Sequence, residues 1–316
     1  MKIHLNKELF RDLIDLINTR SGIAIDIIEK DYYVCMVLEE LSKKQKDLKA
    51  YFKGGTAIYK ILDTMNRFSE DIDLTVKVLP EDSNTRNKKR LKESALGYKS
   101  EGLELIKEEC IDHKGSVTGV YKYRSIFEDS RIPLQRAGKI QVESTSFTVS
   151  EPIEKYYIEP IIYKLASNSE KKILKEQFDV SEIEIEIIKL ERMFIDKIFA
   201  VEFYYIRKMY MDVSKHLYDI SVLFYNEKIQ KFLNDKQEVL KLIEYKRKEE
   251  KARIGGIDAN LPIKNFNYFK LEFSDELVKD FENMQNKYVL NDKYKVSLNN
   301  VKNVIKQIYD IICNLK

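Results

Sequence analysis

Apolar side chains recur three and four positions apart near the start of the chain, in residues 6–20 and again in residues 24–44, which predicts two helices. After residue 45 the pattern changes. Residues 51–52 predict a short strand that runs into the Gly-Gly-Thr sequence at 54–56. A helix is then expected over residues 57–65.

The next part of the chain mixes strand-like and helix-like patterns. Ile72, Leu74 and Val76 alternate with polar residues, as in a half-buried strand. Lys, Arg and Glu dominate residues 82–111, which predicts a long exposed helix. Three further strands and one helical patch are expected at residues 116–127, 139–148 and 183–188, and at residues 160–166, respectively.

From Leu190 onward the whole pattern is helical. Serines precede the last two runs and are expected to cap their N-termini. The expected helices lie at residues 191–209, 214–224, 227–253, 274–288 and 297–315, with a break at Gly255-Gly256. We therefore expect an α+β protein with two domains: residues 1–190, which hold the N-terminal helices and an α/β core, and a helical C-terminal domain at 191–316. The N-terminal helices could pack on either half.

Composition narrows the class of protein. The 316 residues carry 55 Lys and Arg against 52 Asp and Glu, a formal charge of +3, so a basic surface must be local. The three cysteines are scattered and form no disulfide framework or paired metal motif. No signal peptide is visible, and no window approaches the roughly 18 apolar residues of a membrane span. We expect a soluble, cytoplasmic protein that does not bind membranes.

The residues that carry chemistry lie between the first two predicted strands. In a strand–glycine–helix arrangement, Gly54 and Gly55 let the backbone approach a ligand, and free N–H groups at the helix start face a phosphate, with the Thr56 hydroxyl as a further donor. Asp71 and Asp73 stand two positions apart on a strand, so both carboxylates point to one face. Mg²⁺ takes one or two such carboxylates plus phosphate oxygens, and the combination indicates metal-assisted phosphoryl or nucleotidyl transfer.

Each feature alone is weak evidence. A Gly-Gly sequence is usually only a turn, and an Asp-x-Asp sequence is usually a solvated edge strand. Found together in this order, with a strand, a turn and a helix between them, they favour the catalytic interpretation.

The same residues resemble a known family. Lys53-Gly-Gly-Thr-Ala-x-x-Lys60 followed by Arg67-Phe-Ser-Glu-Asp-Ile-Asp-Leu74 is similar to the signature of the AbiEii/AbiGii-type nucleotidyltransferases, the toxins of AbiE abortive-infection and toxin–antitoxin systems. Three more segments resemble family motifs: Glu29-Lys30-Asp31-Tyr32, Glu191-Arg192-Met193-Phe194 with Lys197, and Lys215-His216-Leu217-Tyr218-Asp219-Ile220. Met193 and Lys215 replace the usual Thr and Arg, and neither change removes a catalytic group. After about residue 227 no motif matches.

This resemblance implies a polymerase-β-like nucleotidyltransferase core that transfers a nucleoside monophosphate from an NTP and releases pyrophosphate. The implied cofactor is Mg²⁺ or Mn²⁺. The implied acceptor is RNA, notably the 3′ end of tRNA, and the implied partner is a cognate antitoxin. A monomer is the default for this family, and phage defence is its associated role.

The resemblance also implies roles for individual residues. Gly54, Gly55 and Thr56 would cradle the β- and γ-phosphates, and Asp71 and Asp73 would hold the metal ions. Ser69 matches a serine beside the metal site of the family. Glu143 is placed to act as a third carboxylate and metal ligand, although an exposed strand glutamate is an equal alternative.

The helical half offers further candidates. Lys197 lies in an apolar helical stretch, where a charge needs a partner or a task, and binding the triphosphate would supply both. Arg192 could also bind the nucleotide, or could be a solvated or ion-paired residue. Asp219 could orient Lys197, contact the nucleotide or form a structural ion pair. His216 is expected to be a satisfied helix histidine, and the basic run at 246–253 is a solvated face or an RNA contact.

Three functions remain open from the sequence. The first is an NTP:RNA nucleotidyltransferase toxin. The second keeps the enzyme core but transfers to a protein or to a small molecule such as an aminoglycoside. The third is an NTP-binding protein without turnover, against which the intact Gly-Gly-Thr, Asp-x-Asp and Lys197 count.

Overall fold

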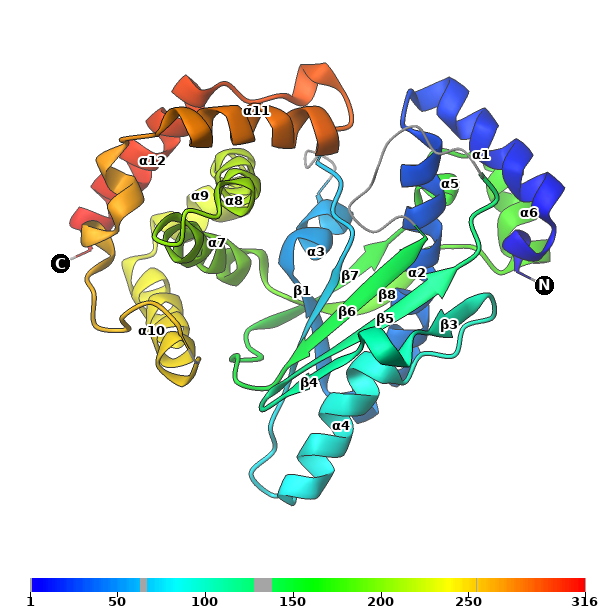
Figure 1. Ribbon diagram of the computed structural model, residues 1–316, viewed down its shortest axis with the longest axis horizontal. Helices are drawn as coiled ribbons and strands as arrows, with labels where there is room; N and C mark the ends of the chain where they lie inside the picture. The colour runs from blue at the N-terminus through cyan, green and yellow to red at the C-terminus, as the bar shows by residue number, and fades with distance from the viewer. Residues whose placement is uncertain (1, 63–66, 128–137, 254, 316) are drawn as a thin grey trace. The chain divides into compact units, whose positions relative to one another are not determined.

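The structure is a computed structural model that describes the whole chain except residues 1, 63–66, 128–137, 254 and 316 (Figure 1). The described residues form two compact units. The first comprises residues 2–62 and 68–188, and the second comprises Arg67 and the chain from Lys189 onward. Each unit has its own set of buried apolar side chains.

A mixed eight-stranded sheet forms the centre of the first unit, in the order β3-β5-β6-β2-β1-β8-β7, with β4 paired to β5 (Figure 1). β2 runs antiparallel to β1 and parallel to β6, while β1 runs parallel to β8. The strands are β1 (Ala50–Lys53), β2 (Ile72–Val76), β3 (Leu103–Leu105), β4 (Ile111–His113), β5 (Ser116–Tyr123), β6 (Lys139–Thr145), β7 (Ile153–Ile158) and β8 (Ile183–Ile188). This mixed architecture confirms the predicted fold class.

Six helices accompany the sheet among the residues described for this unit: α1 (Lys7–Ser21), α2 (Ile25–Leu48), α3 (Gly54–Ile61), α4 (Asn84–Leu96), α5 (Ile161–Lys164) and α6 (Asn168–Phe178). α2 packs on β8, β1 and α4, and α4 packs on β5, β6 and β2. At Gly119 a Cβ atom would lie 2.2 Å from the main-chain oxygen of Ala95, so α4 approaches β5 closely at a position without a side chain. The two N-terminal helices therefore belong to this unit.

The second unit is helical throughout its described part. Its helices are α7 (Leu190–Tyr205), α8 (Tyr210–Leu223), α9 (Glu227–Leu233), α10 (Lys236–Ala252), α11 (Asp275–Tyr288) and α12 (Leu298–Cys313). α8 contacts α7, α11 and α12. The Ser274 and Ser297 side chains accept hydrogen bonds from the N–H groups of Leu277 and Asn300, which confirms both predicted caps.

Short 3₁₀ segments complete the described secondary structure: Ile3–Leu5, Lys107–Glu109, Ile263–Asn265, Asn267–Lys270 and Asp292–Tyr294. No helix in the described part of the chain is both long enough and apolar enough to cross a membrane.

Several sequence predictions are wrong in detail. The helix expected over 82–111 ends at Leu96, because Gly97 follows it and Gly102 adopts a positive φ of 86° that turns the chain into β3. The single helix expected over 227–253 is two helices, since Asp235 caps a new N-terminus by accepting from the N–H of Glu238. β7 and α6 were not predicted. The helix expected at 57–65 begins at Gly54, and its last residues lie outside the described part.

Candidate active site

Gly54 lies at the junction between β1 and α3, and the helix begins at this residue without an intervening turn. Its φ is +82°, and a Cβ atom built there would lie 2.0 Å from Oδ2 of Asp73. Lys53 and Asp73 are opposite each other in the β1–β2 pair. The absence of a side chain at residue 54 therefore permits both the backbone conformation and the contact between the helix start and the carboxylate. Figure 1 shows α3 directly following β1.

Thr56 braces the segment that precedes β2. Its hydroxyl is buried, donates a hydrogen bond to the main-chain carbonyl of Asp71, and lies 3.0 Å from the hydroxyl of Ser69. The side chain thus links the first turn of α3 to both ends of the Ser69–Asp71 segment. The main-chain N–H groups of the first helical turn have no partner within the helix and are the groups that an anion binds.

Three carboxylates lie on or next to two neighbouring strands. Asp73 in β2 and Glu143 in β6 are register partners in a parallel pair, so their side chains project from the same face of the sheet. Asp71 directly precedes β2, two residues before Asp73, and all three residues are partly exposed. Val142, by contrast, pairs with Gly119, whose open face is covered by α4. The carboxylates are therefore on the face of these strands that α4 does not cover.

These groups fit a divalent cation as part of its ligand shell. Within residues 2–62, 67–127, 138–253 and 255–315, no three His, Cys, Asp or Glu side chains converge closely enough to hold a metal ion by themselves. Mg²⁺ does not need such a set, because it takes one or two carboxylates and completes its octahedron with water and phosphate oxygens. The side-by-side Asp73 and Glu143 can supply those carboxylates.

A second polar cluster lies inside the helical unit. Asp219 in α8 is fully buried and is shared by two cations. Arg67 donates to both of its oxygens, from Nε to Oδ1 at 2.9 Å and from Nη2 to Oδ2 at 3.0 Å. Lys197 in α7 lies with its Nζ 2.7 Å from Oδ2 of Asp219 and 3.3 Å from Nδ1 of His216. The predicted pairing of Lys197 with Asp219 is therefore present.

The charges in this cluster set its protonation. Burial alone would raise the pKa of Asp219, but the neighbouring Arg67 and Lys197 outweigh it and bring that pKa to about 2. Burial and the charge of Lys197 lower the pKa of His216 well below its ordinary value. The neutral His216 can therefore accept a hydrogen bond from the Lys197 ammonium, which confirms the expected histidine with a satisfied ring nitrogen.

Arg192 is placed differently from Lys197. Its side chain is buried in α7, and Nη2 pairs with Asp196 at 3.0 Å and with Glu249 of α10 at 2.6 Å. This is the ion-paired alternative left open by the sequence. It ties α7 to α10.

The basic run at 246–253 is also engaged within the unit. Lys246 pairs with Glu249 and Glu250, Arg247 donates to the carbonyls of Ala259 and Leu261, Lys248 pairs with Glu244, and Arg253 lies over the ring of Phe203. The run is therefore less available to an RNA than its sequence indicates.

The segment Glu29-Lys30-Asp31-Tyr32 lies on α2, and its four side chains make four different buried contacts. Glu29 accepts from the Ser125 hydroxyl and the Ile126 N–H, and Lys30 pairs with Glu70 at 2.6 Å. Asp31 pairs with Lys60, and the Tyr32 hydroxyl lies 2.9 Å from Nδ1 of His4. Consecutive charged residues within an otherwise apolar helix were the available signal. Arg67 was likewise missed as a partner of Asp219.

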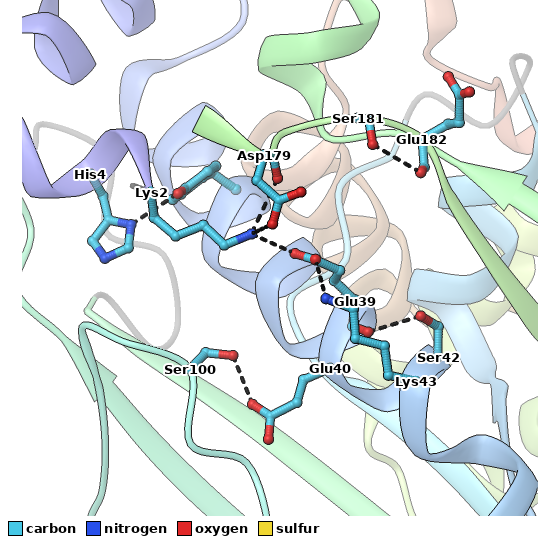
Figure 2. Close-up of polar contacts among 11 residues, drawn as sticks. Lys2, His4, Glu39, Glu40, Ser42, Lys43, Ser100, Asp179, Ser181 and Glu182 are labelled. Carbon is cyan, nitrogen blue, oxygen red and sulfur yellow. Dashed lines mark hydrogen bonds and ion pairs between the residues drawn. The ribbon is translucent and has the colours of Figure 1, made fainter. Parts of the chain in front are cut away.

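A further concavity in the first unit has a volume of about 270 Å³ and is separate from the carboxylates. Figure 2 shows its polar wall, where the Lys2 ammonium lies between Glu39, at 2.9 Å, and Asp179, at 3.0 Å. Lys2 is thus ion-paired with two of the acidic side chains of this concavity.

Known proteins that resemble this chain are nucleotidyltransferases, in agreement with the geometry of the site. The sequence profile of the family described as "Nucleotidyl transferase AbiEii toxin, Type IV TA system" matches residues 37–301. MenT4, a nucleotidyltransferase toxin from Mycobacterium tuberculosis H37Rv, is similar in structure, with a TM-score of 0.54, 15% identity, and coverage of 96% of this chain and 90% of MenT4.

An H. pylori protein described as a nucleotidyltransferase candidate aligns with a TM-score of 0.33 and 14% identity, over 91% of this chain and 96% of its own. No curated protein matches the sequence.

Proposed function

The chain belongs to the AbiEii family of nucleotidyltransferase toxins from type IV toxin–antitoxin systems, and on this premise we propose that it transfers a nucleoside monophosphate from an NTP to RNA, with the 3′ end of tRNA as the favoured acceptor. The observation that supports the site is the placement of Asp73 beside Glu143 and against Gly54 at the start of α3. This brings carboxylates for a metal ion next to the first-turn N–H groups of α3, which have no partner within the helix.

In this proposal Asp71, Asp73 and Glu143 hold Mg²⁺ or Mn²⁺, which neutralises charge on the triphosphate. The N–H groups of Gly54, Gly55 and Thr56 bind the β- and γ-phosphates. Ser69, whose hydroxyl lies 3.0 Å from that of Thr56, is assigned a place beside the metal site. Glu143 also orients the acceptor hydroxyl and accepts its proton as that oxygen attacks the α-phosphate and pyrophosphate leaves.

The helical unit contributes a cation in this scheme. Lys197 binds the triphosphate, and Asp219 and His216 orient its ammonium. Arg192 was the other nucleotide-binding candidate. Its burial against Asp196 and Glu249 favours a structural role instead. The domains are proposed to be a nucleotidyltransferase core at 1–190 and a helical domain at 191–316.

We assign the exposed basic face of α4 as the surface that would contact the body of a large RNA. Its exposed face carries Arg86, Lys88, Lys89 and Lys92, and Lys88 and Lys89 have no ion-pair partner among the described residues. A shallow hollow runs between these lysines. Since α4 lies on the sheet face opposite the carboxylates, it would contact a part of the acceptor remote from its reacting end. An acceptor that reaches both α4 and the carboxylates must be a large polyanion, and this requirement favours tRNA over a small molecule.

The remaining features of the proposal follow from the family. We propose a cytoplasmic protein that a cognate antitoxin opposes, with a monomer as the default state; abortive infection is the role associated with the family, and phage defence by this protein is left to experiment. A neighbouring reading frame for a small winged-helix-type protein would support the antitoxin.

The test is to incubate the protein with Mg²⁺, total RNA and each of four α-³²P-labelled NTPs. We expect label in a tRNA-sized band with one NTP, and none with the variant Asp71→Ala. The control is Asp47→Ala, which replaces an exposed aspartate on α2 and should label RNA normally. Equal labelling by Asp71→Ala would refute the metal site.

The other outcomes separate the alternatives. Label on protein or on an aminoglycoside would change the acceptor class and retain the enzyme. NTP binding without label on any acceptor would favour a binding protein without turnover.

A further inference from the structure

We propose that Lys30 and Asp31 of α2 are positioning residues that hold the two halves of the nucleotidyltransferase site in register: the segment that carries Asp71, and the helix that begins at Gly54. This inference rests on the proposed function for its catalytic consequence. The contacts that carry it all lie within the first unit.

Lys30 holds the metal-binding segment. Its Nζ lies 2.6 Å from Oε2 of Glu70, and the two side chains are 0% and 7% exposed. Glu70 stands between Ser69 and Asp71, both of which Thr56 contacts. The segment Ser69–Asp71 is thus held from two sides. Lys30 of α2 pairs with the Glu70 side chain, and Thr56 of α3 contacts the Ser69 hydroxyl and the Asp71 carbonyl.

Asp31 holds the phosphate-binding helix. It pairs with Lys60 of α3, with side chains 1% and 3% exposed, and its Oδ2 accepts a hydrogen bond from the N–H of Ile161 at 2.7 Å. Lys60 also donates to the carbonyl of Glu159 at 3.1 Å. Burial opposes the charge of Lys60, but the Asp31 carboxylate outweighs it and raises the pKa of Lys60. Lys60 therefore stays charged, and its contact with Asp31 directs it to α2.

Adjacent positions on a helix point about 100° apart, so residues 30 and 31 can each reach a different element. Neither pair is expected to contribute much to the free energy of unfolding, because the desolvation of two charges offsets most of their mutual attraction. What a buried, hydrogen-bonded pair supplies is a defined geometry, because a displacement of either side chain leaves a buried polar group without its hydrogen bond. The two pairs therefore relate the start of α3 to the Asp71 segment through a common helix.

The experiment compares single and double removal of the Lys30–Glu70 pair. Lys30→Met and Glu70→Gln each leave a buried charge and are expected to lower the melting temperature. The double variant Lys30→Met/Glu70→Gln removes both charges at nearly constant volume and should regain most of that loss. If the pair is only structural, the double variant also regains function.

Three measurements on the double variant decide the question: hydrogen exchange of the Ser69–Asp73 amides, the affinity for Mn²⁺ alone, and the kinetics of transfer. We expect faster exchange, Mn²⁺ binding weaker by about tenfold, as for other groups that support metal ligands, a lower kcat and an unchanged KM for RNA. The matched control is Arg90→Met/Asp82→Asn, which removes another buried pair of this unit, with side chains 7% and 5% exposed, and should leave the amide exchange and the Mn²⁺ affinity unchanged.

Wild-type exchange, Mn²⁺ affinity and transfer in a folded double variant would overturn the proposal. If that variant does not fold, Lys30→Arg decides, because it keeps the charge and alters the contact: weaker Mn²⁺ binding at an unchanged melting temperature supports positioning, and unchanged binding refutes it. A wild-type protein that transfers nothing would refute the proposed function, while the exchange rates would still test the positioning.

Discussion

Gly54 packs against the Asp73 side chain at a position where the Cβ atom of any other residue would clash. Gly54→Ala would place Cβ 2.0 Å from Oδ2 of Asp73 and would also strain a φ of +82°. We expect transfer activity to fall by at least about tenfold, because moving a reacting group by about 1 Å costs this much or more. The measurement is kcat for NMP transfer.

The chain provides a matched control for the strain. Gly22 has a φ of +71°, but a Cβ there meets nothing within 4 Å. Gly22→Ala should therefore lower stability by about 1–2 kcal/mol, the cost of a left-handed non-glycine residue, and leave kcat unchanged. Equal losses of kcat in both variants would mean that backbone strain, and not the carboxylate, explains Gly54.

Glu143 tests the interpretation of the third carboxylate. Because it lies beside Asp73 in the parallel register, Glu143→Gln should lower kcat by about 10²-fold or more, the usual contribution of a general base, at an unchanged KM for NTP. Glu104→Gln is the control, since Glu104 is an exposed strand glutamate paired with Lys122 in β5. A kcat within twofold of wild type would return Glu143 to the role of a surface residue.

At this scale, local sequence pattern predicted the residues whose roles depend on near neighbours. Asp71 and Asp73 are two positions apart, and Gly54 begins the adjacent helix. The partners of Lys30 and Arg67 could not be predicted, because Glu70 and Asp219 lie 40 and 152 residues further along the chain. Nothing in a helical charge pattern indicates which distant charge it will meet.

Among the elements, α4 presents the basic face whose role can be tested directly. Lys88→Ala/Lys89→Ala should raise the KM for full-length tRNA and reduce the salt dependence of its binding by about one logarithmic unit of slope per lost phosphate contact. Because α4 lies opposite the carboxylates, a short oligonucleotide acceptor should react equally well with the variant and the wild type. The measurements are KM for both acceptors at several salt concentrations.

Equal losses for the short and the long acceptor would place the reacting end itself on α4 and would contradict the proposed arrangement. Alanine is compatible with an exposed helix, so the fold should be unaffected.

The predicted elements are correct where one periodicity or one cap determines them, as in α1, β2 and the serine-capped α11 and α12. They fail where several short elements follow one another. Residues 97–111 have the charge pattern of a continued helix, but Gly97 and Gly102 allow a turn into β3, whose pairing with β5 then fixes the strand. Strand pairing is a long-range interaction, so a helical charge pattern does not exclude it.

The whole molecule consists of two compact units, and each contains a histidine that folding keeps neutral. Burial lowers the pKa of His4 in the first unit, and burial together with Lys197 lowers that of His216 in the second. In the unfolded chain both titrate near 6.5. Below that pH the unfolded state binds more protons than the folded state. The contribution of each neutral histidine to the free energy of unfolding is therefore fully present above pH 6.5 and decreases as the pH falls.

We therefore expect the melting temperature to decrease between pH 7.5 and 5.5 as both histidines of the unfolded chain become protonated. His4→Gln and His216→Gln should each reduce the decrease, and if the units unfold separately, each variant should alter one transition only. His113→Gln, at an exposed position in β4, is the control. Below about pH 4 the stability should decrease further. The pKa of Asp219 is lowered to about 2 in the folded state, so protonation of this carboxylate favours the unfolded chain. A melting temperature independent of pH between 7.5 and 5.5 would show that neither histidine is held neutral.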